Sequence, residues 1–429
     1  MCNFLTANKD QLVNIKLNLK QEYKNIKNLN LNLDMSRGKP SSEQLDLSMS
    51  MLDTISSGSD CFSAGNIDCR NYGASEGINE IKELMSQIME ANKDNIIIGG
   101  NSSLSLMFDT VSYFMTHGIL GCLPWTGQND IKFLCPSPGY DRHFSITQHF
   151  GIKMIPIKMN SDGPDMNEIQ NLVENDDTVK GIWCVPKYSN PQGITYSNSV
   201  VTKFAKLRPA AKDFRIFWDN AYAVHDLTNS EEKLLSIFEE CDKYNSSDLP
   251  IMFCSTSKIT FAGSGVSAIA CAGENLKNLK KRFSFKTIGY DKINQLRHFK
   301  FLKNINTLKY HMKKHAEILN PKFNLVINKF KEHFLNNPII SWTEPKGGYF
   351  ISVETLNGCA KETVKYCKGA GLKLTDAGAT YPYGIDPGDS NIRIAPSYPN
   401  FEELDKAMDV FCLCAKLAAI EKLIMFQSS

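Results

Sequence analysis

The stretch IMFCSTSK, residues 251–258, is the most informative part of the chain. Its first four residues are apolar and predict a buried strand, and three small hydroxyl side chains then lead to Lys258. A lysine at the exit of a buried strand is held on a rigid support, where its neutral amine can form a Schiff base with a carbonyl compound. Lysines after strands are also common on protein surfaces. The residues upstream distinguish a reactive lysine from an ordinary surface lysine.

Two strands upstream of Lys258 are also followed by polar residues. GIWCV at residues 181–185 leads into Asn190, and FRIFW at residues 214–218 is followed by Asp219 and Tyr222. In an open parallel sheet, ligands bind outside the carboxyl ends of the strands. The three strands should therefore bring an amide, a carboxylate with a phenol, and a lysine to one edge. These are the groups that a bound pyridoxal phosphate needs.

Strand and helix patterns alternate through the first three hundred residues. Helical spacing predicts helices that begin near Gly77 and Leu104 and one over 197–207, and the polar segment 226–249 is expected to be a surface excursion. Short apolar runs predict strands at 95–98, 133–135, 154–157, 181–185, 215–218, 251–254 and 268–272. This alternation predicts an α/β fold, a three-layer α/β/α domain with a mostly parallel sheet.

The two ends of the chain predict further units. A lysine-rich helical region over about residues 294–333 should lead to a second domain, whose last helix begins after Asn400 with the capping-box residue Glu403. Near the N-terminus, helical spacing of apolar residues predicts a helix that packs on the body, at Leu12, Ile15, Leu19, Tyr23 and Ile26. We therefore expect an N-terminal arm (1–45) that contributes to a small domain, a large cofactor-binding domain (46–300), and a smaller C-terminal α+β domain (301–429).

Composition excludes several classes of function. The chain has 48 basic against 46 acidic residues and a net charge of +2, so no overall field attracts nucleic acid or an anionic membrane. Its 13 cysteines show no metal-binding spacing, and reduced thiols in a cytosolic protein explain them best. Residues 1–28 contain neither a signal peptide nor a transmembrane segment, and they lack the arginines of an organellar presequence. A cytoplasmic protein without a metal, nucleic-acid or membrane partner is expected.

Together with RGKPS at residues 37–41 and SKITFAG at residues 257–263, these motifs resemble the fold-type I, class I pyridoxal-phosphate aminotransferases. More narrowly, they resemble the divergent aspartate aminotransferase subgroup that carries both segments, from about residue 34 to the C-terminus. The resemblance implies a homodimer that exchanges an amino group between an L-amino acid, with aspartate or glutamate expected, and a 2-oxo acid by a ping-pong route.

Other functions within and outside this class stay open at this point. Transamination of alanine, aromatic amino acids or kynurenine, and β-elimination, use the same fold. A ligand-sensing regulator with an aminotransferase-like domain is disfavoured, because too few residues precede Arg37 for a DNA-binding domain and no basic patch is evident. A catalytically inactive paralogue is disfavoured because the catalytic positions are filled.

The resemblance assigns roles around the cofactor ring. Lys258 should form the Schiff base and later move the substrate α-proton as general base and acid. Asp219 should pair with the pyridine nitrogen, so that the ring stays protonated. Asn190 and Tyr222 should hydrogen-bond the phenolic oxygen of the cofactor, and Tyr140 should stack on the ring.

The phosphate is expected at residues 101–103, in the loop before a helix. Orphan amides and the helix dipole favour a dianion there, with Asn101, Ser102 and Ser103 as contacts, although Ser102 could serve only as a helix cap. Ser255 and Ser257 should add contacts, and Tyr72 should reach the phosphate from the neighbouring subunit.

The chain departs from the family after the lysine. Residues 263–266 read GSGV, where an arginine usually neutralises the phosphate, and Lys292 and Arg297 are candidates to replace it.

Substrate recognition is expected to rest on arginine. Arg393, in a run of apolar residues, should hold the α-carboxylate in two hydrogen bonds, together with Asn190. Gly38 should let the backbone approach the substrate. A dicarboxylic substrate needs a second cation, for which Arg37 is the first candidate, ahead of Arg142 and Arg297.

Overall fold

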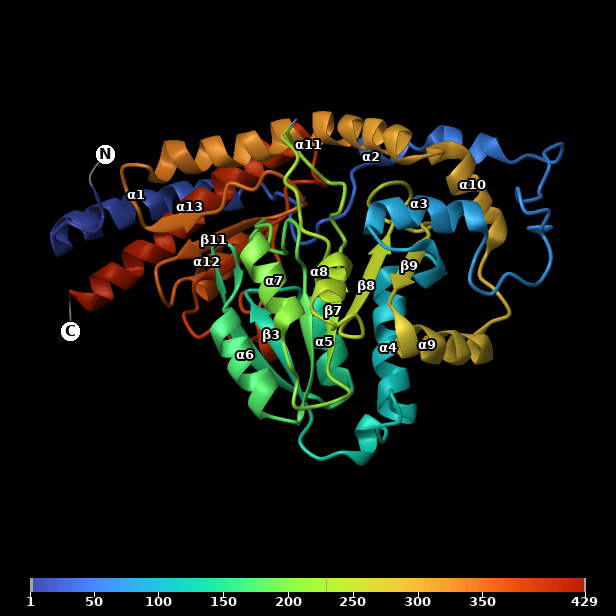
Figure 1. Cartoon of the computed structure of the whole chain (residues 1–429). Coiled ribbons are helices and arrows are strands. Elements are labelled where there is room, and N and C mark those ends of the chain that lie inside the picture. The colour runs from blue at the N-terminus through green and yellow to red at the C-terminus, as the bar shows by residue number, and fades with distance from the viewer. Residues whose placement is uncertain (1–2, 229, 428–429) are drawn as a thin grey trace.

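The computed structural model of the chain describes residues 3–228 and 230–427 (Figure 1). Its largest sheet has the strand order β2-β9-β8-β7-β6-β3-β4-β5. Neighbours run parallel from β8 across to β4, whereas β9 is antiparallel to β8 and β2, and β5 is antiparallel to β4. The strands are β2 Ile96–Ile98, β3 Lys132–Ser137, β4 Lys153–Asn160, β5 Gly163–Pro164, β6 Val179–Cys184, β7 Arg215–Asp219, β8 Pro250–Ser255 and β9 Ser267–Ala270. The prediction of a mostly parallel sheet is confirmed.

Side chains of each strand alternate between two cores, one on each face of the sheet. In β6, Ile182 joins the core on one face and Trp183 the core on the other, and Ile216 and Phe217 repeat this in β7. Both faces are buried, which is why the strands read as continuous apolar runs. One core is covered by α3 Asn79–Met89, α6 Met166–Asn175, α7 Asn198–Lys206, α8 Ile237–Lys243 and α10 Lys292–Leu302, the other by α4 Ser103–His117, α5 Asp141–His149 and α9 Gly273–Lys286. These are the three layers that the sequence predicts.

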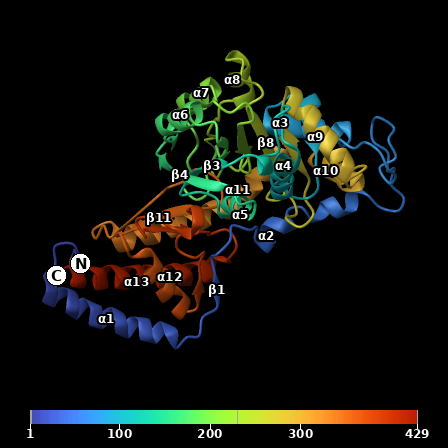
Figure 2. The same ribbon diagram turned by 90° about the horizontal axis from the view of Figure 1, so that it is seen from below.

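A third core is built largely from the C-terminal elements and the N-terminal helix (Figure 2). A three-stranded antiparallel sheet, in the order β10-β11-β13, packs with long helices. The first helix, α1, lies along the last, α13, in both views, and Leu12 and Leu19 of α1 are buried there. The elements are α1 Lys9–Lys27, α11 Ile305–Phe334, β10 Ile340–Trp342, β11 Ile351–Thr355, α12 Ala360–Gly369, β13 Asn391–Ile394 and α13 Phe401–Phe426. The predicted N-terminal helix and the Asn400–Glu403 capping box are both confirmed.

Short elements connect these layers. β1 Leu33–Asp34 pairs in parallel with β12 Leu372–Lys373, which ties the N-terminal segment to the C-terminal elements. The others are α2 Ser42–Asp46 and four 3-10 turns, η1 Met49–Thr54, η2 Lys93–Asn95, η3 Trp125–Gly127 and η4 Pro382–Gly384. Within the described part of the chain, no helix combines the length and the apolar character needed to cross a bilayer.

One prediction about the fold was wrong in part. The segment 226–249 is not only a surface excursion, because it contains α8, whose Ile237 and Cys241 are buried against α7. Leu227, at the start of the segment, is buried as well. The helix escaped detection because its seven residues are mostly charged and only two apolar side chains fall at helical spacing.

Candidate active site

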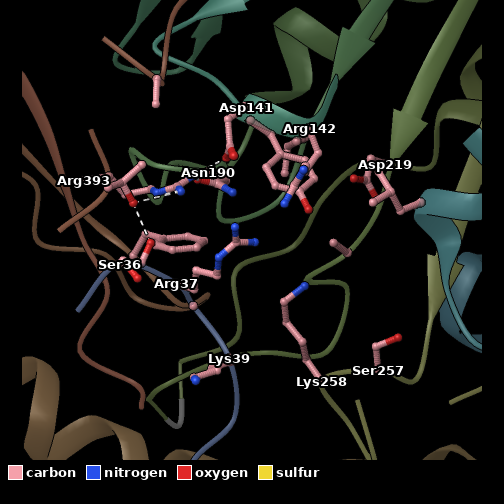
Figure 3. A pocket seen from close by; sticks show the side chains of 18 of the residues that line it. Ser36, Arg37, Lys39, Asp141, Arg142, Asn190, Asp219, Ser257, Lys258 and Arg393 are labelled. Atoms are coloured by element: carbon pink, nitrogen blue, oxygen red, sulfur yellow. Dashed lines mark hydrogen bonds and ion pairs between the residues drawn. The ribbon is translucent and has the colours of Figure 1, made fainter. Parts of the chain in front are cut away.

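A cavity of about 560 Å³ opens at the carboxyl ends of the parallel strands (Figure 3). β7 ends there at Asp219 and β8 at Ser255, and the loop after β6 brings Asn190. The cavity brings together most of the residues that the sequence singled out, namely Arg37, Gly38, Ser102, Ser103, Tyr140, Asn190, Asp219, Tyr222, Ser255, Ser257, Lys258 and Arg393.

Four other predicted residues do not line this cavity. Asn101 tethers two loops, because its carbonyl accepts a hydrogen bond from Ser257 Oγ at 3.0 Å and its amide donates to the Gly263 carbonyl. Tyr72 is 82% exposed. Lys292 and Arg297 lie on α10, where the Arg297 guanidinium donates to the side chain of Asn294. The expected roles of these four residues in phosphate binding therefore stay predictions.

Asp219 carries a buried carboxylate that is only half satisfied. Its side chain is 3% exposed, and its Oδ2 lies 3.0 Å from Nε2 of His143, a residue of α5 whose ring stacks on Trp183 at 4.4 Å. Its Oδ1 has no hydrogen-bond partner within residues 3–228 and 230–427. A buried carboxylate oxygen without a donor is costly, so a donor from a ligand is expected at this position.

Lys258 faces the same cavity. Burial lowers the pKa of its amine, and the negative charge of Asp219 opposes that shift. Its Nζ lies 5.0 Å from the centre of the Tyr222 ring, and burial raises the pKa of Tyr222 well above the ordinary value. The neutral amine that a nucleophile requires is therefore favoured by the surroundings of Lys258.

Buried histidines contact three consecutive residues that begin at the lysine. Nε2 of His225 lies 3.3 Å from the Lys258 carbonyl oxygen, and Nε2 of His311 lies 2.8 Å from that of Ile259. Nε2 of His298 lies 2.9 Å from Oγ1 of Thr260. Burial lowers the pKa of each of these imidazoles, that of His298 to about 4. Three consecutive residues are thus each fixed by a neutral histidine from a different part of the chain.

The N-terminus of α4 offers a place for an anion. Ser102 caps the helix, since its Oγ accepts a hydrogen bond from the Leu104 amide at 3.2 Å, and Ser103 begins the helix at the cavity wall. Across the cavity, Ser255 Oγ donates to Ser257 Oγ at 3.1 Å. The unpaired amides of the first turn and the helix dipole fit a phosphate group at this end.

Arg393 lies at the opposite end of the cavity, on β13. Its side chain is 5% exposed, and its Nη1 donates to Asp141 Oδ1 at 2.8 Å and to Asn190 Oδ1 at 3.2 Å. Its Nη2 donates to Thr375 Oγ1 at 3.2 Å, and its guanidinium lies over the ring of Phe350 at 4.8 Å. The group is therefore held rigidly, as recognition of a carboxylate requires.

The cavity wall is predominantly basic. The side chains of Arg37 and Arg142 reach into the space between Arg393 and Lys258 in Figure 3, and neither has a hydrogen-bond or ion-pair partner in the described part of the chain. Six basic and three acidic side chains line the cavity. The basic ones are Arg37, Lys39, Arg142, Lys258, Lys373 and Arg393, and the acidic ones are Asp141, Asp219 and Asp376. The balance favours anionic ligands. No cluster of histidine, cysteine or acidic side chains suited to a metal ion occurs among the described residues.

Sequence reasoning missed several side chains of the site. Asp141 and His143 follow Tyr140 directly, but polar residues in the first turn of a helix are common and carry no signal of their own. Thr375 and Phe350 were also missed, because their contacts with Arg393 depend on how separate segments pack, which the sequence pattern does not show.

Comparison with known proteins agrees with this geometry. Residues 7–427 match the family described as "Aspartate amino-transferase". An aspartate aminotransferase of Corynebacterium glutamicum is 41% identical over 404 residues, which cover 94% of this chain and 93% of that protein. The structure of an aspartate transaminase from the same organism superposes with a TM-score of 0.95 at 39% identity, over 98% of this chain and 99% of that one. LysN, the α-aminoadipate aminotransferase of Thermus thermophilus, shares the fold at 16% identity and a TM-score of 0.71, over 92% of this chain and 93% of its own. The chain therefore belongs to the aspartate aminotransferase family, whose members are fold-type I aminotransferases.

Proposed function

We propose that the protein transfers the amino group between L-aspartate or L-glutamate and a 2-oxo acid, with pyridoxal phosphate bound at Lys258. The observation that carries this proposal is the buried Oδ1 of Asp219, which no donor among the described residues reaches and which stands in the same cavity as Lys258. The protonated pyridine nitrogen of the cofactor is a donor that fits this carboxylate. The aminotransferase family supplies the reaction class, with amino acids and 2-oxo acids as substrates.

When bound, pyridoxal phosphate supplies an aldehyde that accepts the amino group and a protonated ring that accommodates the electron pair left at the substrate α-carbon. Asp219 would hold the proton on the ring nitrogen, and His143 orients Asp219 through Oδ2. Tyr222 and Asn190 are the proposed partners of the phenolic oxygen, and Tyr140 is proposed to stack on the ring.

Lys258 is the residue proposed to transfer the proton. Its neutral amine would take the proton from the substrate α-carbon as a general base and, once protonated, would give that proton back as a general acid. The lowered pKa of Lys258 suits this role, because an amine that is protonated cannot act as a base. Arg393 would hold the α-carboxylate in one position. The orientation of the substrate then brings its α C–H bond to face the lysine.

We propose that the phosphate binds between the start of α4 and the serines at the end of β8. Ser102, Ser103, Ser255 and Ser257 are its proposed hydroxyl contacts, while Asn101 supports the loop through its carbonyl. The backbone amides of the first turn carry most of the charge compensation in place of the family's usual arginine.

The preference for a dicarboxylic substrate rests on Arg37 and Arg142. Both line the cavity, and neither guanidinium is committed to another group in residues 3–228 and 230–427. A second substrate carboxylate would pair with one of them, with Gly38 allowing the backbone beside Arg37 to come close. Alanine or an aromatic amino acid would leave both cations unpaired.

We also propose that the active form is a homodimer in which Tyr72 reaches the phosphate of the neighbouring subunit. Tyr72 is 82% exposed, Phe285 76% and Ile288 62%. The two segments that carry them adjoin, because a Cβ at Gly289 would stand 2.7 Å from the Gly73 carbonyl oxygen. Exposed apolar side chains gathered in this way are typical of an interface.

Three further assignments complete the proposal. The segment RGKPS at residues 37–41 would place the chain in the subgroup of aspartate aminotransferases that carries it. The domain division is proposed at 1–45, 46–300 and 301–429, which is supported by the separate cores of the large sheet and the C-terminal elements. The location is proposed to be the cytoplasm.

The test is to record the visible absorption of the cofactor-loaded protein while L-aspartate, L-glutamate and L-alanine are added separately. Aspartate and glutamate should convert the band of the aldehyde form into that of the amine form, and 2-oxoglutarate should restore it. A band that none of the three amino acids changes would contradict the proposed substrates. A protein that never acquires a band would contradict the role of Lys258.

A further inference from the structure

We propose that Thr375 is a positioning residue for substrate specificity, which fixes the separation between Arg37 and Arg393. The proposal rests on the proposed function, in which Arg393 receives the α-carboxylate of the substrate. It deepens that function, because it assigns the second carboxylate to Arg37 and names the residue that keeps the two guanidinium groups at a constant distance.

The hydroxyl group of Thr375 joins Arg393 to the backbone beside Arg37. It accepts a hydrogen bond from Nη2 of Arg393 at 3.2 Å and donates to the carbonyl oxygen of Ser36 at 2.5 Å. A hydroxyl has one hydrogen to donate, so Thr375 has none left for a ligand carboxylate, although it lines the cavity. Thr375 therefore acts through Arg393 and the Ser36 carbonyl rather than on the substrate itself.

The pairing of two short strands brings Thr375 to Ser36. β1 and β12 are parallel neighbours, and just after β1 the amide of Met35 donates to the Lys373 carbonyl at 2.9 Å. Ser36 and Thr375 lie just beyond this pairing, and the threonine hydroxyl continues the contact where the backbone hydrogen bonds end. The segment that carries Arg37 is thus tied to the C-terminal elements.

Arg37 depends on its backbone for its position. Its side chain reaches into the cavity in Figure 3 and has no hydrogen-bond or ion-pair partner in the described part of the chain. Gly38 beside it lies against Phe350, because a Cβ at Gly38 would stand 2.5 Å from Cζ of that ring. The same ring lies 4.8 Å from the Arg393 guanidinium. The residues on both sides of Arg37 are therefore held by groups that also contact Arg393, and Thr375 is the one that does so by hydrogen bonds.

Arg142 is the alternative partner of the second carboxylate, but its distance from Arg393 is set by two separate cores. Arg142 lies on α5, whose Phe144 packs in a core of the large sheet. Met35, two residues before Arg37, packs in the same core as β13, the strand that carries Arg393. Two guanidinium groups supported by one core keep a constant separation, which suits the recognition of a substrate by its length. A dicarboxylic amino acid and its 2-oxo acid have their carboxylates equally far apart along the carbon chain, so the same pair of arginines serves both.

Two unreactive ligands that differ only at the side-chain end make the test. 2-Methylaspartate and 2-amino-2-methylbutanoate both lack the α-proton and cannot be transaminated, and the second has a methyl group in place of the side-chain carboxylate. Their dissociation constants would be measured by titrating the visible absorption of the cofactor-loaded protein, for the wild type and for variants of Thr375 and Arg37. Thr375→Val keeps the shape of threonine without the hydroxyl, and Thr375→Ser keeps the hydroxyl.

Thr375→Val should reduce the preference for 2-methylaspartate, taken as the ratio of the two dissociation constants, by about tenfold, because Arg37 loses its fixed position. The affinity for 2-amino-2-methylbutanoate should change by less than about threefold, since other side chains still hold the guanidinium that binds the α-carboxylate. These are Asp141 and Asn190. Thr375→Ser should keep the wild-type ratio.

Arg37→Met should abolish the preference, and Thr375→Val added to it should lower the ratio no further. Thr116→Val, which removes the hydroxyl of an exposed threonine on α4, is the matched control and should alter neither constant. A preference that survives Arg37→Met would place the second carboxylate elsewhere. An unchanged ratio in Thr375→Val, or an equal weakening of both ligands, would mean that the hydroxyl does not position Arg37. Each of these results overturns the inference, whereas a wild-type protein without a preference for 2-methylaspartate would overturn the proposed substrates as well.

Discussion

Gly38 is a residue whose missing side chain shapes the carboxylate end of the cavity. A Cβ at this position would stand 2.5 Å from Cζ of Phe350, whose ring in turn lies 4.8 Å from the Arg393 guanidinium. The alanine variant Gly38→Ala should therefore displace the ring and, with it, the guanidinium. We expect its KM for the amino acid to rise about tenfold, as a misplaced carboxylate clamp would predict, with pyridoxal phosphate affinity unchanged. Steady-state kinetics and a cofactor titration measure both quantities.

Gly58→Ala is the control for this substitution, because a Cβ there meets no atom within 4 Å. It should leave KM and stability as they are. An unchanged KM in Gly38→Ala would mean that Phe350 moves aside without disturbing Arg393.

Single residues of the site were predictable from sequence when they directly follow a recognisable strand. Lys258 and Asp219 each follow a buried apolar strand, and the carboxyl ends of parallel strands meet at one edge. Asp141 and His143 had no such signal, because their partners Arg393 and Asp219 lie 252 and 76 positions further along the chain. Pairing across such separations is decided by packing, which a single sequence does not reveal.

Helices and strands were predictable from sequence where their apolar residues form a clear pattern. β6 and β7 are buried on both faces and read as unbroken apolar runs, and α3 shows a regular apolar face. The fully buried apolar side chains of α8 are those of Ile237 and Cys241, and the helix forms because α7 lies beside it. Its helical state therefore depends on tertiary contacts rather than on local sequence.

The packing of α1 on α13 gives a prediction at this scale. Leu12 of α1 is fully buried, whereas Leu17 of the same helix is 64% exposed. Leu12→Ala should destabilise the protein by about 2–5 kcal/mol through the lost contacts and the cavity that remains. Leu17→Ala should change stability by less than about 0.5 kcal/mol. Thermal and urea unfolding midpoints measure the difference, and equal midpoints for the two variants would show that α1 detaches without cost.

The histidines behind Lys258 should make stability depend on pH. Burial lowers the pKa of His298 to about 4 and that of His315 to about 3, and it lowers those of His225 and His311 as well. The unfolded chain titrates these groups near pH 6.5, so it binds more protons than the folded protein below that pH. Their contribution is fully present above about pH 6.5 and is lost as pH falls toward about 4, by up to about 1.4 kcal/mol per pH unit for each histidine.

Urea unfolding midpoints between pH 7 and pH 5 measure this slope. The slope should be smaller in His298→Gln, whatever its absolute stability, and unchanged in His149→Gln, which alters an exposed histidine of α5. An unaltered slope in His298→Gln would show that His298 is already protonated in the folded protein.

At the scale of the whole molecule, the cavity draws on the large sheet, on α4 and on the C-terminal β13, but Tyr72 lies outside it. The proposed homodimer would bring Tyr72 of one subunit to the phosphate of the other. In a mixed dimer of the Lys258→Ala and Tyr72→Ala chains, both substitutions then fall in the same site. The site with an intact Lys258 would receive its Tyr72 from the Lys258→Ala chain, and so it would be complete.

Random exchange of equal amounts of the two variants makes half of the dimers mixed, each with one complete site of two. About a quarter of all sites should therefore regain wild-type cofactor affinity and turnover. The measurement is activity at a pyridoxal phosphate concentration too low to saturate Tyr72→Ala, where each variant alone is nearly inactive. Tyr310→Ala, which alters a tyrosine 64% exposed on α11, should bind the cofactor normally by itself. If the mixture gives no more activity than its two components, then Tyr72 does not act across the interface, and each subunit must hold its phosphate with its own residues.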